Sequence, residues 1–167
     1  MNNTKKDNAG SLFRKIDKSI VQWKKAHGIK LLRLSIGFVF LWFGVLKFFP
    51  NVSPAEGLVL DTIHRMTFGL FTDSQITLGL ALWEVLIGVG LISGKLMRMV
   101  LLLLFLQLPG TFLPIFFFPE QVFEWIPWVP TLKGQYIFKN LILIAAGIVM
   151  GSHVEPHPLG GLREKEG

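Results

Sequence analysis

The stretch LGLALWEVLIGVGLI, residues 78–92, decides the fold of this chain, because it is strongly apolar and carries a single charge, Glu84. A transmembrane helix needs about 20 predominantly apolar residues, and similar apolar blocks precede and follow this one. The sequence therefore predicts an all-α integral membrane protein, a four-helix bundle. The four predicted spans are approximately residues 31–49, 76–92, 96–118 and 136–150.

The composition supports a membrane protein and narrows the chemistry. Hydrophobic residues make up 51% of the chain and charged residues 17%, whereas a soluble domain carries about a quarter charged residues. The chain has no cysteine, which excludes disulfides and thiol chemistry. No phosphate-binding loop, zinc-protease motif, nucleophile elbow or dinucleotide fingerprint is present. We therefore expect that this protein is not an enzyme on its own and that it has no metal site. No catalytic residue can be assigned from the sequence.

The basic N-terminal arm, residues 1–28, leads directly into the first span. Residues 1–33 contain nine lysines and arginines against two aspartates, a net charge of +7. Apolar residues recur at helical spacing between the basic ones, which predicts an amphipathic helix on the inner membrane surface. We expect contact with anionic lipid and no binding of nucleic acid. A solvated helix that docks a partner protein is the alternative. The apolar residues of this helix are Leu12, Phe13, Ile16, Ile20 and Trp23.

The membrane bundle, residues 29–152, takes its orientation from its basic turns. Arg33 precedes the first span, and Lys95 and Arg98 lie in the short turn between the second and third. Because basic residues favour the cytoplasmic side, we expect these three as topology anchors and both termini in the cytoplasm. The tail, residues 153–167, then lies inside. The loop of residues 51–75 is predicted to be a helical lid on the outer face, because Ser53–Glu56 is typical of a helix start.

Three charged residues inside the predicted spans are candidates for a ligand site. Lys47, Glu84 and Lys139 are expected to cluster in the outer half of the bundle, with Asn140 beside them. A charge within a span costs about 2.5–3.5 kcal/mol on insertion scales, so each requires a partner or a function. The cluster would have a net charge of +1 and would favour an anion or an electronegative headgroup. Two alternatives remain open: the lysines reach the outer interface by themselves, or Glu84 forms a purely structural ion pair.

Small and kinking residues predict how the helices pack. Gly37, Gly44 and Gly88 are expected to let helices approach closely. Pro109 and Pro114 are expected to kink the third span.

Several segments together resemble the DoxX family of small bacterial membrane proteins. The resemblance covers about residues 30–152 and includes the first span with Lys47, the second with Glu84 and Gly88, and the fourth with Lys139 and Asn140. The segments that carry it are RLSIGFVFLWFGVLKFFP (33–50), SPAEGL (53–58), LWEVLIGVGLI (82–92), LLLLFLQLPGTFLP (101–114) and LKGQYIFKNLILIAAG (132–147).

The resemblance implies a multi-pass protein of the bacterial inner membrane that is associated with redox systems. We therefore expect an accessory subunit of a quinone-linked redox system, with a quinone headgroup or a small anion as its ligand and a redox partner protein as the source of electrons. A homo-oligomer is a further expectation. The alternatives are a non-catalytic structural or assembly subunit of a membrane complex and, third, a small transporter.

Overall fold

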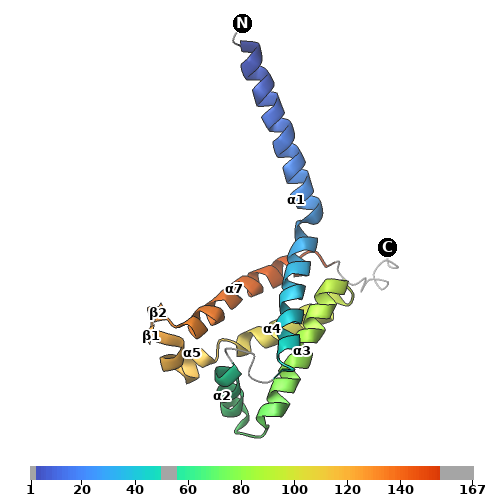
Figure 1. The fold of residues 1–167 in the computed structure, drawn as a ribbon. Helices are drawn as coiled ribbons and strands as arrows, with labels where there is room; N and C mark the ends of the chain where they lie inside the picture. The colour runs from blue at the N-terminus through green and yellow to red at the C-terminus, as the bar shows by residue number, and fades with distance from the viewer. Residues whose placement is uncertain (1–2, 50–55, 155–167) are drawn as a thin grey trace, which may run out of the picture.

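The computed structural model describes residues 3–49 and 56–154, and it is helical almost throughout (Figure 1). Within this part of the chain, four helical segments are long and apolar enough to cross a membrane. This arrangement confirms the prediction of an all-α membrane protein. The four segments are Arg14–Leu46, Asp73–Ser93, Met97–Phe117 and Leu132–Gly151.

The first helix, α1 (Asn3–Leu46), contains both the N-terminal arm and the first span. The arm is helical, as expected, but it continues into the span without a break. The only helix-weakening residue at the junction is Gly28, which a helix tolerates at a cost of about 1 kcal/mol. The residues of the arm from 14 to 28 are all exposed. In Figure 1 this half of α1 projects away from the other helices.

The second span, α3 (Asp73–Ser93), packs closely against the second half of α1. Thr72 and Gln75 form a capping box at its start, and Gly94 ends it in the left-handed conformation, with φ of 70°. A Cβ at Gly88 would lie 2.8 Å from the Cα of Leu41, so at this position the two backbones are in contact. Glycine is required here because any larger side chain would separate the helices.

The third span is broken, as its prolines lead one to expect. Helix α4 (Met97–Gly110) ends just after Pro109, and the short helix α5 (Pro114–Phe117) begins at Pro114. Between them the backbone makes tighter bonds, such as Thr111 N–H to Leu108 O at 3.0 Å. Proline lacks the N–H of an α-helical bond, which explains the interruption.

The core lies where α1, α3, α4 and α7 (Leu132–Gly151) meet. Trp83 also links two of these helices, because its indole N–H donates to the Leu103 carbonyl of α4 at 3.2 Å. The buried side chains of this core are Ile36, Phe40, Ile87, Leu91, Val100, Leu101, Leu104, Leu108, Ala146 and Met150.

A second, smaller cluster closes the other end of the bundle. It joins α2 (Glu56–Thr67) to α6 (Pro119–Val122), to α7 and to an antiparallel pair of short strands, β1 (Phe123–Trp125) and β2 (Val129–Pro130). The Arg65 guanidinium of α2 lies over the rings of Phe117 and Phe118, 5.7 and 5.9 Å from their centroids.

Helix α2 occupies the middle of the loop predicted as an outer lid. His64 at its end lies 2.7 Å from the Asp73 carboxylate at the start of α3, which ties the lid to the bundle. The predicted start of this helix, residues 53–55, lies outside the described residues, as does the predicted tail from residue 155 onward.

Candidate functional site

An ion pair between Lys47 and Glu84 joins α1 to α3. The Lys47 ammonium donates a hydrogen bond to Oε2 of Glu84, and the two side chains are 17% and 13% exposed. Lys47 follows directly after the end of α1, in a turn where its N–H bonds to the Gly44 carbonyl at 3.3 Å. A Cβ at Gly44 would lie 3.0 Å from that of Glu84, so this glycine brings the two helices close enough for the pair to form.

The pair lies at the middle of α3 and not at its outer end. Glu84 comes 11 residues after Asp73 and nine before Ser93, which places it about 16 and 14 Å from the two ends of the helix. Sequence reasoning placed the pair in the outer half of the bundle because it took the second span to begin at residue 76. Helix α3 instead begins at Asp73, three residues earlier, so Glu84 lies at its mid-length.

A third residue, Gln107 of α4, completes the site. Its amide N–H₂ donates to Oε1 of Glu84 at 3.0 Å, so the carboxylate is held by α1 and α4 at once. The other end of the amide, Oε1 of Gln107, is buried and has no hydrogen-bond partner in the described part of the chain. The amide cannot simply be reversed, because its oxygen would then face the carboxylate oxygen.

Sequence reasoning did not assign Gln107 to the site, although a signal was present. Gln107 is the one polar residue in the run LLLLFLQL, residues 101–108. A buried amide in an apolar span requires partners as much as a charge does, but its partner could not be identified without knowing which helix faces it.

The three side chains form a neutral site with unused hydrogen-bonding capacity. The bond to Glu84 occupies one of the three N–H groups of Lys47, and Gln107 offers an unpaired buried acceptor. Leaving a buried acceptor unpaired costs about 1–3 kcal/mol, so a molecule that donates a hydrogen bond there would be stabilised. The groups left over at this site, N–H donors on Lys47 and an acceptor on Gln107, match a small polar group that both accepts and donates hydrogen bonds.

Lys139 and Asn140 of α7 lie apart from this ion pair. The Lys139 side chain is exposed, and its ammonium lies 5.1 Å from the centroid of the Tyr136 ring. Asn140 donates to Oγ1 of Thr111 at 2.9 Å, and Thr111 in turn donates to the Leu108 carbonyl. Consecutive residues of a helix point about 100° apart, so only one of the two can face α4. The structure thus pairs Glu84 with Lys47 and Gln107 in place of Lys139.

The bond from Asn140 to Thr111 should stabilise the packing of α7 on α4 modestly. We expect Asn140→Ala to lower the free energy of unfolding by about 0.6 kcal/mol, with an upper bound of about 1.7 kcal/mol, as for other hydrogen bonds between membrane helices. Unfolding of the purified protein by SDS in mixed micelles measures this change. Ile142→Ala, at an exposed position on the same helix, is the control. Equal effects of the two substitutions would show that the bond contributes nothing.

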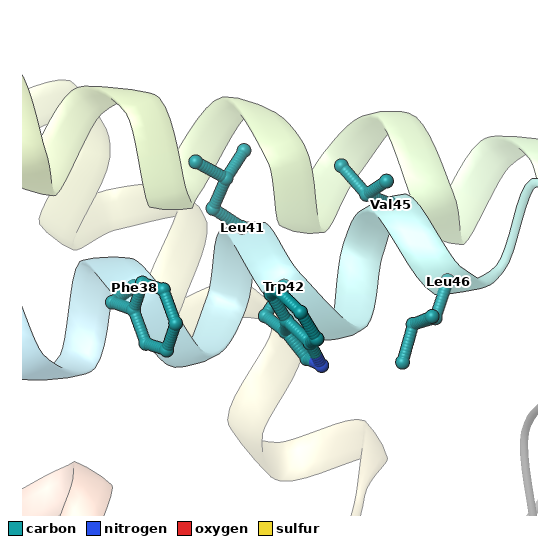
Figure 2. Close-up of a pocket in the computed structure, with 5 residues that line it drawn as sticks. All are labelled: Phe38, Leu41, Trp42, Val45 and Leu46. Carbon is teal, nitrogen blue, oxygen red and sulfur yellow. The ribbon is translucent and has the colours of Figure 1, made fainter.

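An apolar groove runs along the second half of α1 (Figure 2). It has a volume of about 280 Å³. Leu41 and Val45 point toward α3, and the rings of Phe38 and Trp42 lie 5.7 Å apart between their centroids. Leu46, which also lines the groove, directly precedes Lys47. The groove is lined by apolar residues and suits a hydrocarbon chain.

The three predicted topology anchors gather at one end of the bundle. A Cβ at Gly94 would collide with the Arg33 guanidinium, so Arg33 packs against the turn between α3 and α4. Lys95 and Arg98 are exposed in and just after the same turn.

The apolar helices and their shared core define an integral membrane protein whose long helices are joined by a polar site. No protein-family model, no curated protein and no solved structure matches this chain.

Proposed function

We propose that this protein is a DoxX-like accessory subunit of a quinone-linked redox system, and that it binds a quinone headgroup at Lys47, Glu84 and Gln107. The observation that carries the proposal is the unpaired, buried Oε1 of Gln107 beside an ion pair at the middle of the bundle. A partner protein supplies the electrons, since this chain has no cysteine and no cofactor motif of its own.

The hydrogen-bonding groups of the site match those of a quinone. A quinone carbonyl accepts hydrogen bonds, which Lys47 can donate with its remaining N–H groups. The hydroxyl of the reduced form donates a hydrogen bond, which Oε1 of Gln107 can accept. The three side chains carry no net charge, so the site favours such a neutral group over the anion that a cluster including Lys139 would have favoured.

The apolar groove on α1 supports a ligand that dissolves in lipid. Its lining residues are all apolar, and it lies on the helix whose end carries Lys47. Such a lining suits the isoprenoid tail of a quinone. Such a ligand enters from the bilayer and needs no aqueous channel.

The charge distribution supports a location in a bacterial inner membrane with both termini in the cytoplasm. Arg33, Lys95 and Arg98 lie at the end of the bundle from which the basic arm projects. Positive residues near span ends favour the cytoplasmic side, where anionic lipid also attracts the arm.

Quinone extracted from the purified protein tests this function. The protein is isolated in mild detergent and extracted with organic solvent, and the oxidised-minus-reduced ultraviolet spectrum of the extract is recorded. We expect quinone in near-stoichiometric amount in the unaltered protein and in Lys139→Gln, and its loss in Gln107→Leu and Glu84→Gln. Quinone at the level of the co-purified lipid alone, or retained in both site variants, would contradict the proposal.

A structural or assembly role is the second candidate, and one observation favours it. Both carboxylate oxygens of Glu84 already accept hydrogen bonds, one from Lys47 at the end of α1 and one from Gln107 of α4. These bonds connect three helices and would fix their relative positions. This role predicts that no quinone is bound and that Gln107→Leu lowers stability without any other effect. The same extraction, followed by SDS unfolding of the variants, separates the two functions.

A further inference from the structure

The N-terminal arm has a narrow apolar stripe that nothing in the described residues covers. Its apolar residues are Ile16, Ile20 and Trp23, and the polar His27 follows on the same side of α1, with offsets of four, three and four. The Trp23 and His27 rings stack with 5.2 Å between their centroids, and all four residues are exposed.

The rest of the arm surface is strongly basic. Residues 14–30 carry six lysines and arginines and a single acidic residue, Asp17. Arg14, Lys18 and Lys25 lie opposite the apolar stripe, while Lys24 and Lys30 lie at its edges. A helix with an apolar stripe, a basic opposite face and a tryptophan has the composition of helices that lie in the membrane interface.

Gly28, between the arm and the first span, differs from the glycines of the bundle. A Cβ at Gly37, Gly44 or Gly88 would lie 3.0 Å or less from atoms of the facing helix, whereas a Cβ at Gly28 would have nothing within 4 Å. No close packing therefore requires glycine at position 28. A glycine in a helix lowers the resistance of the backbone to bending, and Gly28 precedes Arg33, the inner end of the bundle, by five residues.

We infer that the arm bends at Gly28 and lies along the anionic inner surface of the membrane, with its apolar stripe in the lipid and its basic residues at the phosphate groups. In the straight form of α1 the stripe faces water. Bending buries it, and it brings the basic residues next to lipid charges of opposite sign.

The charge of the arm favours anionic lipid, and not a second copy of this chain, as the partner that covers the apolar stripe. Two arms side by side would each bring a net charge of +5 from residues 14–30, and they would repel each other. The stripe has the alternating four–three spacing of a coiled-coil seam, but residues 16–27 cover fewer than two heptads, and a coiled coil needs at least three or four. This inference does not depend on the proposed quinone site, which is formed by Lys47 beyond the far end of α1, by Glu84 of α3 and by Gln107 of α4.

Spin labelling of the full-length protein tests the inference, and the absence of cysteine makes each label unique. A nitroxide is placed at Ile20→Cys on the stripe or at Lys18→Cys on the basic face. Its accessibility to oxygen, which partitions into lipid, is compared with its accessibility to a water-soluble nickel complex. The protein is reconstituted one copy per nanodisc, in phosphatidylcholine with or without phosphatidylglycerol.

With phosphatidylglycerol present, we expect the label at position 20 to favour oxygen several-fold over the label at position 18. The difference should shrink in phosphatidylcholine alone. Equal, water-like accessibility at both positions in the anionic nanodiscs would overturn the inference. So would strong spin–spin coupling between labels at position 20 when several copies share one vesicle, since it would identify a second copy as the partner of the stripe.

A second substitution tests the bend itself. Gly28→Ala in the Ile20→Cys background should shift the label toward water, because alanine stiffens the helix at this point. Gly79→Ala is the matched control, since a Cβ there also has nothing within 4 Å but lies in α3, away from the arm. An unchanged label environment in Gly28→Ala would overturn Gly28 as the bending point.

Discussion

Glu84→Ala should lower the free energy of unfolding by about 3–5 kcal/mol, the range measured when one partner of a buried ion pair is removed. The substitution leaves the Lys47 ammonium at the middle of the bundle without its counter-charge. It also leaves the Gln107 amide without the acceptor that it now uses. SDS unfolding in mixed micelles, followed by the loss of helical circular dichroism, measures the change.

Two controls show whether the loss of stability in Glu84→Ala comes from leaving the Lys47 ammonium without a counter-charge. Lys139→Ala removes an exposed lysine of the neighbouring span and should have little effect. The double variant Lys47→Met with Glu84→Leu replaces both charges by apolar groups and should recover most of the stability, because no unpaired charge remains. If Glu84→Ala were as mild as Lys139→Ala, Lys47 would be reaching the interface on its own and the ion pair would not stabilise the fold.

Gly88→Leu should destabilise the protein by about 3 kcal/mol, the upper end of the usual range for overpacking. A Cβ at this position would lie 2.5 Å from the backbone nitrogen of Leu41 and 2.8 Å from its Cα. The obstacle is backbone, which cannot rotate away, so α1 and α3 must separate. That movement would also pull Lys47 from Glu84. The same unfolding assay measures the loss.

Gly79→Leu is the matched control for this prediction, because it makes the same chemical change on the same helix. A Cβ at Gly79 would have no atom within 4 Å, so the new side chain points into lipid. We expect no loss, and a gain of up to about 1 kcal/mol from the better helix propensity of leucine. Similar effects at positions 79 and 88 would contradict the close contact between α1 and α3.

The features that follow from the lipid environment were predictable from the sequence. Apolar blocks of sufficient length can cross a bilayer only as helices, so the four spans follow from hydropathy alone. The proximity of Lys47 and Glu84 was predictable for the same reason, since two opposite charges in apolar spans stabilise each other. The break in the third span follows from the chemistry of Pro109 and Pro114.

The features that depend on how the helices face one another were not predictable. Lys139 and Asn140 are neighbours in the sequence, and only packing decides that Asn140 faces α4 while Lys139 is exposed. The bond from Gln107 to Glu84 depends on the rotation of α4, which a uniformly apolar run leaves undetermined. The end of α1 at Leu46 was missed because the apolar pattern continues through Phe48 and Phe49.

The position of Glu84 along α3 has an electrical consequence. Glu84, and with it the polar site, lies about halfway along α3, a helix long enough to cross a membrane. Moving one elementary charge across the whole membrane changes its energy by about 2.3 kcal/mol per 100 mV. A proton that reaches Glu84 from either side would cross roughly half of that potential drop, or about 1.2 kcal/mol per 100 mV. The protonation of a molecule bound at this site would therefore respond to the voltage of an energised membrane.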